Sequence, residues 1–276
     1  MRPPLQAGML SKSIREIWPV TFALGLVALA LEAALAYVLP VKFQADFADQ
    51  WMKLGFVQNI MRIVLGADVS GGIGPEVMAA LAWAHPAVLA LFFAHAIIVC
   101  TRIPAGEIDR GTADTLLALP VSRWQILCSD AAAWLAAGVV LLAFACGGNL
   151  LGGSAAPPSS RVASERTLPV LANLYCLYVA SGGIAYLASS FGDRKGRAMT
   201  GVFILVLVSF LLNYLSQLWQ PLERFAFLSL LRYYQPLTLM RSGAWPIRDM
   251  LILATVGLAT WTAAGVVFSR RDIATA

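Results

Sequence analysis

Long apolar stretches recur along the chain at a length that suits a lipid bilayer. A hydrocarbon core about 30 Å thick needs about 20 residues of helix, each rising about 1.5 Å. Six such stretches occur, and Glu32 alone interrupts the first one. We therefore expect an all-α integral membrane protein with a single transmembrane domain over residues 1–276, whose six helices span residues 18–39, 77–101, 124–151, 169–191, 198–219 and 250–268.

The composition supports a membrane protein over a soluble one. Hydrophobic residues make up 59% of the chain and charged residues 13%, whereas a soluble domain is about half apolar and about a quarter charged. The four cysteines lie within three of the spans and show no CxxC or Cys/His spacing. We expect neither a disulfide framework nor a metal site.

The distribution of basic residues indicates the topology. If the N-terminus is inside, the cytoplasmic segments are short and still hold eleven of the twenty basic residues. This density matches the positive-inside rule. We expect a multi-pass protein of a bacterial-type cell membrane, with both termini in the cytoplasm, the lipid bilayer as surroundings and no nucleic acid partner.

Two further segments are amphipathic or strongly apolar without being spans. Residues 5–17 place apolar side chains on one side of a helix and Lys12 and Arg15 on the other, which predicts an in-plane helix at the cytoplasmic head groups. A frayed leader is the alternative. Residues 220–249 are too apolar for a solvated loop but contain three prolines, so we expect a re-entrant or interfacial outer segment before the last span. It serves either as an anchor or as a gating lid.

The loop over residues 102–123, between the second and third spans, has its own helical pattern. Thr112 is placed to cap a short helix, Leu116 and Leu117 give that helix an apolar side, and Pro120 ends it. A short helix held between two spans can insert into a groove on a partner and pass rigid-body motion to both spans. From these residues alone an ordinary structured turn fits equally well.

The start of the third span carries a second local signal. Ser122 is followed three residues later by Gln125, which is the spacing of a capping box. We therefore expect the third span to begin with a defined N-terminus directly after the short helix.

The same loop resembles a signature of the membrane subunits of ATP-binding-cassette exporters of the ABC-2 class. In that signature a Glu is followed by Gly-Thr, a Leu-Leu pair and Pro-Val-Ser-Arg, and the C-terminal residues 268–273 also look like the usual ending of the family. The matching residues here are Glu107, Gly111, Thr112, Leu116, Leu117, Pro120, Val121, Ser122 and Arg123.

The resemblance implies a permease subunit that works as a dimer, with a second copy or a homologue, on cytoplasmic ATPase subunits. Residues 107–123 would then be the coupling segment, with Glu107, Asp109, Arg110, Leu116 and Leu117 available to touch the ATPase. The full set of expected coupling residues is Glu107, Asp109, Arg110, Gly111, Thr112, Leu116, Leu117, Pro120 and Arg123.

The chain itself lacks the residues that bind ATP. No G-x-x-x-x-G-K-[ST] sequence occurs, so we expect no catalytic residue and no cofactor on this chain. ATP and Mg²⁺ would be bound by the partner ATPase.

Polar residues inside the spans are candidates for a transport path, because charge at membrane depth is costly. By helical rise Glu32 lies about 21 Å and His85 about 24 Å from the cytoplasmic ends of their spans, so the two residues are placed to meet. His95 lies lower, and we favour a buried imidazole bonded to a backbone carbonyl. The candidate path residues are Glu32, His85, His95, Asn173 and Asn213.

Two other polar features have simpler interpretations. Asn173 and Asn213 are expected to join helices by hydrogen bonds rather than to touch substrate, and Gly148 with Gly152 permits close helix approach. Asp130 is expected at the cytoplasmic interface near Arg123.

Two alternative functions use the same residues. One is an intramembrane enzyme built on Glu32, His85 and His95, although no paired-carboxylate, HExxH or nucleophile motif accompanies them. The other is an ion-driven secondary transporter, although the two halves show no matched pair of broken helices.

Overall fold

The chain folds into a bundle of long helices, as the apolar pattern predicts. The computed structural model describes residues 5–42, 54–55, 57, 60 and 74–272, and over these residues it contains helices and no strands. Within these described residues, six helical stretches are long and apolar enough to cross a membrane. They are α1 (Ala7–Lys42), α4 with α5 (Pro75–Ala84 and Pro86–Cys100), α8 (Arg123–Ala155), α9 (Ser164–Phe191), α10 (Lys195–Leu218) and α13 (Ile247–Arg270).

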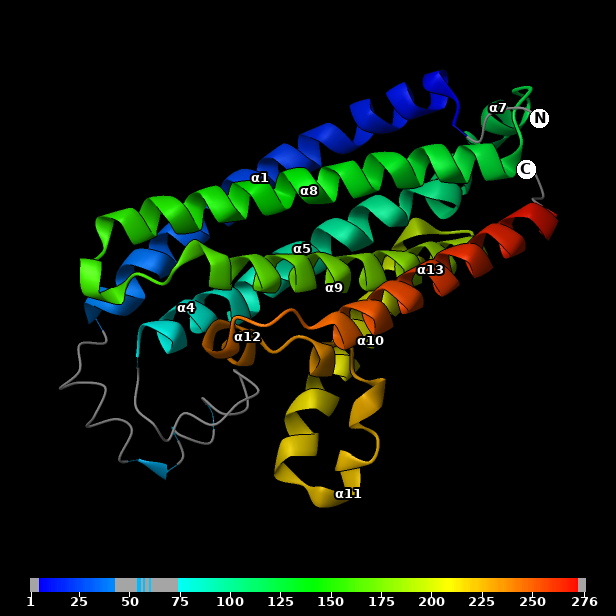
Figure 1. The fold of residues 1–276 in the computed structure, drawn as a ribbon. Helices are drawn as coiled ribbons and strands as arrows, with labels where there is room; N and C mark the ends of the chain where they lie inside the picture. The colour runs from blue at the N-terminus through cyan, green and yellow to red at the C-terminus, as the bar shows by residue number, and fades with distance from the viewer. Residues whose placement is uncertain (1–4, 43–53, 56, 58–59, 61–73, 273–276) are drawn as a thin grey trace.

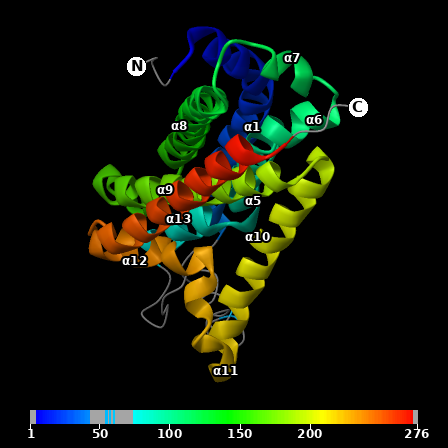
Figure 2. The ribbon, with the colours of Figure 1, turned by 90° about the vertical axis from the view of Figure 1, so that its right-hand side faces the viewer.

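Short helical turns connect the long helices. The start of α1 and the end of α13 lie at one end of the bundle, together with α6 and α7 (Figures 1 and 2). Nearer the opposite end lie α4 and α12, while α11 projects away from the bundle (Figure 1). The short elements are η1 (Arg102–Gly106), α6 (Glu107–Asp109), α7 (Ala113–Leu117), η2 (Pro158–Ser160), α11 (Gln220–Glu223), η3 (Ala226–Leu228), η4 (Leu230–Tyr233) and α12 (Pro236–Ser242).

Glycines allow α1 and α8 to pack backbone against backbone along their length (Figure 1). Gly148 and Gly152 are one turn apart on α8, and a Cβ at either would overlap the α1 backbone, at Leu29 and Ala33 respectively. The close helix approach predicted from this glycine pair is therefore confirmed. The other extensive helix pair is α9 with α13.

The predicted in-plane helix is not separate from the first span. Helix α1 runs from Ala7 through Pro19 to Lys42, so the amphipathic stretch forms the first turns of the membrane-crossing helix. The frayed-leader alternative is wrong, because side chains of these first turns bind residues far along the chain: Ser13 donates to the carboxylate of Asp130 at 2.8 Å. Pro19 lies inside this helix and leaves one backbone carbonyl without its usual helical donor.

The second span is broken where the sequence predicted one continuous helix. Helix α4 ends at Ala84 and α5 begins at Pro86, with His85 between them in an extended backbone conformation. Pro86 has no N–H to donate to α4 and suits the first position of a new helix. The His85 ring accepts a hydrogen bond from the amide of Ala87 and so caps α5.

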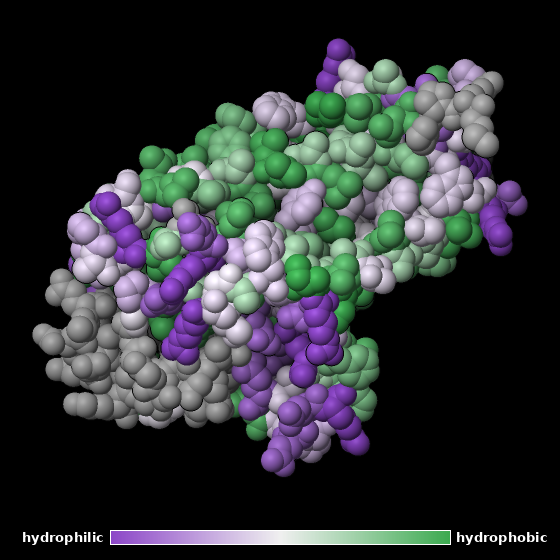
Figure 3. Space-filling view, viewed as in Figure 1, coloured by the Kyte–Doolittle hydropathy of each residue, from purple (hydrophilic) through white to green (hydrophobic). Residues whose placement is uncertain are grey.

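The segment over residues 220–249 is largely buried in its middle and exposed towards both ends. Leu237 and Met240 of α12 are fully buried against α4 and α9, and Tyr234 donates to the carbonyl of Trp83 at 3.2 Å. Phe227 and Leu228 are exposed, and α11 extends from the lower end of α10 in Figure 2. Apolar side chains cover much of the visible side of the bundle, and hydrophilic ones gather at its ends and around this outer segment (Figure 3).

Candidate functional site

The segment between α5 and α8 folds into three short pieces at the end of the bundle where α1 begins (Figure 2). The π-turn η1 leads into α6, Gly111 adopts a left-handed conformation with φ of 68°, and α7 follows. Helix α8 then begins with the predicted capping box: Ser122 accepts from the amide of Gln125, whose side chain accepts from the amide of Ser122. We call residues 102–123 the connecting segment.

Glu107 fixes the connecting segment to the beginning of α1. Its side chain is buried, with the residue 3% exposed, and it accepts hydrogen bonds from Lys12 Nζ at 2.7 Å, from Arg110 Nη2 at 3.0 Å and from the Thr112 hydroxyl. Burial alone would raise the pKa of Glu107, but the hydrogen bonds from Lys12 and Thr112 outweigh it and lower that pKa below the usual range. The charged Glu107 carboxylate therefore links the connecting segment to α1 through hydrogen bonds.

These contacts correct two predictions about the connecting segment. Glu107 does not face outward, because three donors hold its carboxylate inside the protein. Thr112 does not cap α7 with its side chain, since its hydroxyl donates to Glu107 instead. Leu116 is also buried, at 5% exposure, where it packs with Met9 and Ile126.

The outward face of the connecting segment consists of other residues. Leu119 is 45% exposed although it is apolar, and Leu117 is partly exposed. Around Leu119 lies a mixture of charged and small polar side chains. The exposed residues of this face are Asp109, Arg110, Gly111, Thr112, Asp114, Thr115, Ala118, Leu119 and Pro120.

A second charged cluster lies beneath this face and was not predicted from the sequence. Arg102 is 5% exposed and forms ion pairs with Glu16 of α1 and Asp130 of α8. Tyr186 of α9 donates to the other carboxylate oxygen of Asp130 at 2.8 Å, and Ser13 also contacts both Arg102 and Asp130. Asp130 is thus buried, and its bonded partners are Arg102, Ser13 and Tyr186 rather than Arg123.

The charge of Arg102 is held by its partners. Burial alone would lower the pKa of Arg102, but the negative charges of Asp130 and Glu16 outweigh burial and raise it. In the sequence, Asp130 stands out as an acidic residue within an apolar stretch and Arg102 as a basic residue directly after a span. Neither feature shows which residue the side chain pairs with.

The connecting segment also contacts the remaining long helices at this end. Asp109 accepts from the amide of Lys195 at the start of α10, and the amide of Ala105 donates to Ser189 of α9 at 3.1 Å. Arg123 donates to the carbonyls of Phe268 and Arg271 at 2.7 and 2.5 Å, which fixes the end of α13. The segment and its flanking residues therefore touch α1, α8, α9, α10 and α13.

The five candidate path residues do not form one site. Glu32 is fully buried and accepts from the Asn149 amide at 3.0 Å, while His85 caps α5, so the predicted contact between Glu32 and His85 is wrong. The break before Pro86 explains the difference, because it turns His85 into a helix cap. Asn213 lies elsewhere, beside Tyr214 and Tyr234.

His95 joins three helices through side chains. Its Nε2 lies 2.9 Å from the Thr21 hydroxyl of α1 and its Nδ1 lies 3.0 Å from the Tyr178 hydroxyl of α9. The predicted bond to a backbone carbonyl is therefore replaced by two side-chain bonds. Asn173 is fully buried, and its amide has no hydrogen-bond partner among the described residues.

Comparison with known protein families identifies the family of the chain. The sequence model for the family described as ABC-2 family transporter protein matches residues 19–273, which include every long helix apart from the first turns of α1. No curated protein and no solved structure matches the chain.

Proposed function

Because the chain belongs to the ABC-2 family of transporter proteins, we propose that it is the membrane-spanning permease subunit of an ATP-driven exporter. In this role it forms the substrate pathway and couples to a separate ATP-binding-cassette ATPase. The connecting segment is the coupling element, and its exposed face around Leu119 is the surface that docks on the ATPase.

One observation carries this proposal. The connecting segment has an exposed face on one side and two buried charged clusters on the other, centred on Glu107 and on the Arg102–Asp130 pair. A structural element that has one exposed surface and is bonded to several helices can pass a displacement by a partner protein on to those helices. A plain turn between two spans needs no such links.

The proposed mechanism requires no covalent chemistry on this chain. Closure of the ATPase pushes the connecting segment, and the links through Lys12, Asp130 and Arg123 pass the movement to α1, α8 and α13. The bundle then shifts between an inward-facing and an outward-facing packing. The ATPase shifts this population because its affinity for the two packings differs, and ATP binding and hydrolysis drive the cycle.

The chain requires partners for this role. It contains no G-x-x-x-x-G-K-[ST] sequence, so ATP and Mg²⁺ are bound by the ATPase, and a second copy or a homologue completes the pathway. Both described ends and the connecting segment lie at one end of the bundle, which supports a cytoplasmic location for all three in a cell membrane (Figure 1).

The alternative functions receive less support. An intramembrane enzyme needs convergent reactive groups, whereas Glu32, His85 and His95 each bind different neighbours. Nothing in these contacts favours an ion-driven transporter over a permease.

The test is a co-purification of the full chain with the ATPase encoded nearest to it, followed by ATP turnover in lipid nanodiscs. We expect Leu119→Asp to weaken ATPase binding, because a buried unpaired charge at an interface centre is strongly unfavourable. Leu228→Asp is the matched control, since Leu228 is an equally apolar, exposed residue on the outer segment.

Two results would contradict the proposal. One is that no ATPase binds the wild-type chain at any nucleotide state. The other is that Leu119→Asp and Leu228→Asp have equal effects, because a docking surface must respond to its own residues alone.

A further inference from the structure

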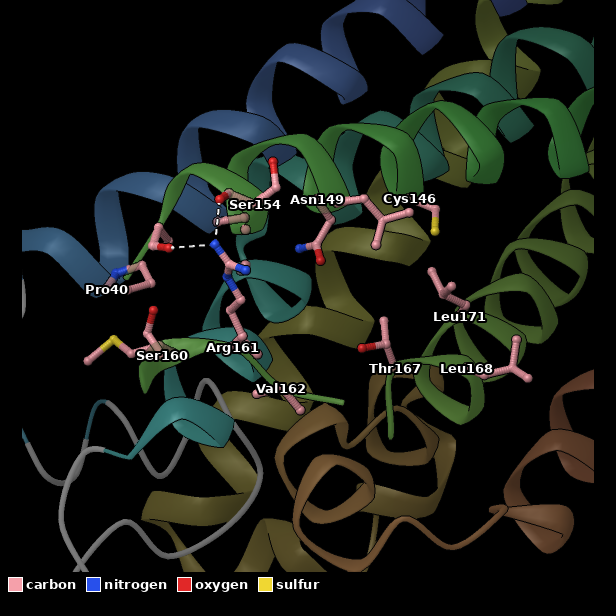
Figure 4. Close-up of a pocket in the computed structure, with 17 residues that line it drawn as sticks. Pro40, Cys146, Asn149, Ser154, Ser160, Arg161, Val162, Thr167, Leu168 and Leu171 are labelled. Atoms are coloured by element: carbon pink, nitrogen blue, oxygen red, sulfur yellow. Dashed lines mark hydrogen bonds between the residues drawn. The ribbon is translucent and has the colours of Figure 1, made fainter. Parts of the chain in front are cut away.

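A cavity of about 420 Å³ opens near the end of the bundle opposite the connecting segment. It lies between the ends of α1 and α8, the start of α9 and the helix α4 (Figure 4). This volume falls within the range of small-molecule sites, about 300–1,000 Å³. The cavity is remote from the Glu107 and Arg102 clusters, so the proposed coupling function does not account for it.

The walls of the cavity are mainly apolar. Met78 and Ala82 of α4, Leu168 and Leu171 of α9 and Cys146 of α8 all line it. Such walls suit a hydrocarbon chain, since burial of each methylene contributes about 0.8 kcal/mol.

A cation is held at the mouth of the cavity. The Arg161 guanidinium donates through Nη2 to the carbonyls of Ser154 and Ala156 at 2.6 and 3.3 Å, and these bonds set its position above the cavity (Figure 4). A guanidinium has five N–H donors, so several remain for a ligand. Within the described part of the chain no carboxylate forms an ion pair with Arg161, whereas nearby Arg166 pairs with Glu76.

Two polar groups lie between the cation and the apolar walls. The Asn149 amide and the Thr167 hydroxyl both line the cavity, and Asn149 is fixed from behind by its bond to the buried Glu32 at 3.0 Å. Because the amide nitrogen is used for Glu32, the Asn149 oxygen is left to accept from a ligand. The second oxygen of Glu32 is buried and has no partner among the described residues.

We propose that this cavity binds an anionic amphiphile, with a phosphate or carboxylate head group on Arg161 and an acyl chain along the α4 and α9 walls. Asn149 and Thr167 bond the polar link between head group and chain. In Figure 4, Asn149 and Thr167 lie between Arg161 and the apolar side chains of α8 and α9, and this order matches the order of groups in such a molecule. In the proposed topology the site faces the outer leaflet.

The experiment measures binding of radiolabelled oleoyl lysophosphatidate to the full chain in nanodiscs of uncharged phosphatidylcholine, without any ATPase. The result is thus independent of the proposed coupling. We expect saturable binding that monooleoylglycerol and glycerol 3-phosphate displace at least about ten-fold less well than the unlabelled ligand. Monooleoylglycerol tests whether an acyl chain alone is enough for binding, and glycerol 3-phosphate tests whether a phosphate head group alone is enough.

Variants connect the binding to the cavity. Arg161→Gln should weaken binding about ten- to one-hundred-fold, which corresponds to one charge-assisted hydrogen bond. Arg224→Gln, at an exposed arginine of the outer segment, should leave binding unchanged. Gly153→Leu should abolish binding because Gly153 lines the cavity, while Gly147→Leu on the same helix should not, and an added Cβ meets nothing within 4 Å at either glycine.

Any one of four results would overturn the inference. These are no saturable binding to the wild type, full displacement by monooleoylglycerol, full displacement by glycerol 3-phosphate, and equal loss of binding in the Gly153 and Gly147 variants. The absence of saturable binding would mean that no such site exists. Full displacement by either competitor would mean that the site recognises only the acyl chain or only the head group. Equal loss in the two glycine variants would mean that the ligand binds outside this cavity.

Discussion

Lys12 and Glu107 are 95 residues apart in the sequence, and their side chains meet at 2.7 Å. This bond joins the first turns of α1 to the connecting segment. Glu107 is the less exposed partner, with its side chain 4% exposed against 36% for Lys12. The pair therefore lies at the boundary between the buried clusters and the docking face, where a partner's push would enter the bundle.

Removal of the Lys12 charge should reduce coupling more than folding. In Lys12→Met the carboxylate of Glu107 keeps Arg110 and Thr112, so we expect a loss of about 1–2 kcal/mol of stability, as for one hydrogen bond to a charged group. Stimulation of the partner ATPase by the permease should fall several-fold. Thermal unfolding and ATP turnover measure the two effects.

Arg15→Met is the control for the Lys12 variant. Arg15 is exposed on the same helix, and its loss removes the same positive charge from the cytoplasmic end. Equal losses of ATPase stimulation in the two variants would show that only net charge matters, and the specific link through Glu107 would be rejected.

The low pKa of Glu107 predicts a pH dependence of stability. The folded-state pKa lies below the ordinary value of 4.5, so the unfolded chain binds more protons between the two values and stability rises with pH there. The contribution is complete above about pH 4.5 and is lost as pH falls through the lower folded pKa. The difference in unfolding temperature between wild type and Glu107→Gln should shrink across that window.

Asp114→Asn provides the comparison for this pH series. Asp114 is an exposed carboxylate of the same segment. Its variant should track the wild type at every pH, and a difference between wild type and Glu107→Gln that stays constant down to acidic pH would contradict the assignment.

The predictable part of the fold was its long apolar helices. Bilayer thickness sets one length for every span, so six apolar stretches identify six helices without knowledge of their packing. The break at His85 was not predicted even though Pro86 is visible, because transmembrane helices tolerate proline where neighbours satisfy the freed backbone groups. The capping box of Ser122 and Gln125 was predicted because both partners lie within one turn.

The position of the connecting segment in the sequence was easier to predict than which of its side chains face outward. The family pattern identified the connecting segment, but burial of Glu107 and Leu116 depends on Lys12 and Met9 of another helix. The Arg102–Asp130 pair likewise forms only when α8 packs beside η1. The spacing of residues within one segment predicts where helices begin and which of their faces are apolar. It does not predict contacts with residues that are distant in the sequence.

The buried pair of Arg102 and Asp130 should show strong energetic coupling. Asp130→Leu leaves a buried guanidinium with Glu16 as its remaining ion-pair partner, and loss of one partner from a buried pair costs about 3–5 kcal/mol. The double variant Arg102→Met with Asp130→Leu removes both charges. It should be more stable than the sum of the single losses predicts, by about 1–3 kcal/mol.

A double-mutant cycle by thermal or denaturant unfolding measures this coupling. Arg102→Met with Asp114→Asn is the reference cycle, because Asp114 is exposed and forms no ion pair among the described residues. Additive losses in the Arg102–Asp130 cycle would mean that the two charges do not stabilise each other.

Contact between α1 and α8 makes Gly148, like Gly152, a size-sensitive position of that helix pair. A Cβ at Gly148 would overlap the carbonyl and Cα of Leu29, and backbone atoms cannot move aside as a flexible side chain can. Gly148→Ala should therefore destabilise the protein by about 1–3 kcal/mol. Gly147→Ala on the same helix meets no atom within 4 Å and should stabilise it by about 0.5–1 kcal/mol, since alanine is the better helix former. Opposite signs in thermal unfolding would demonstrate backbone contact between the helices, whereas equal stabilisation would mean that α1 stands away from α8.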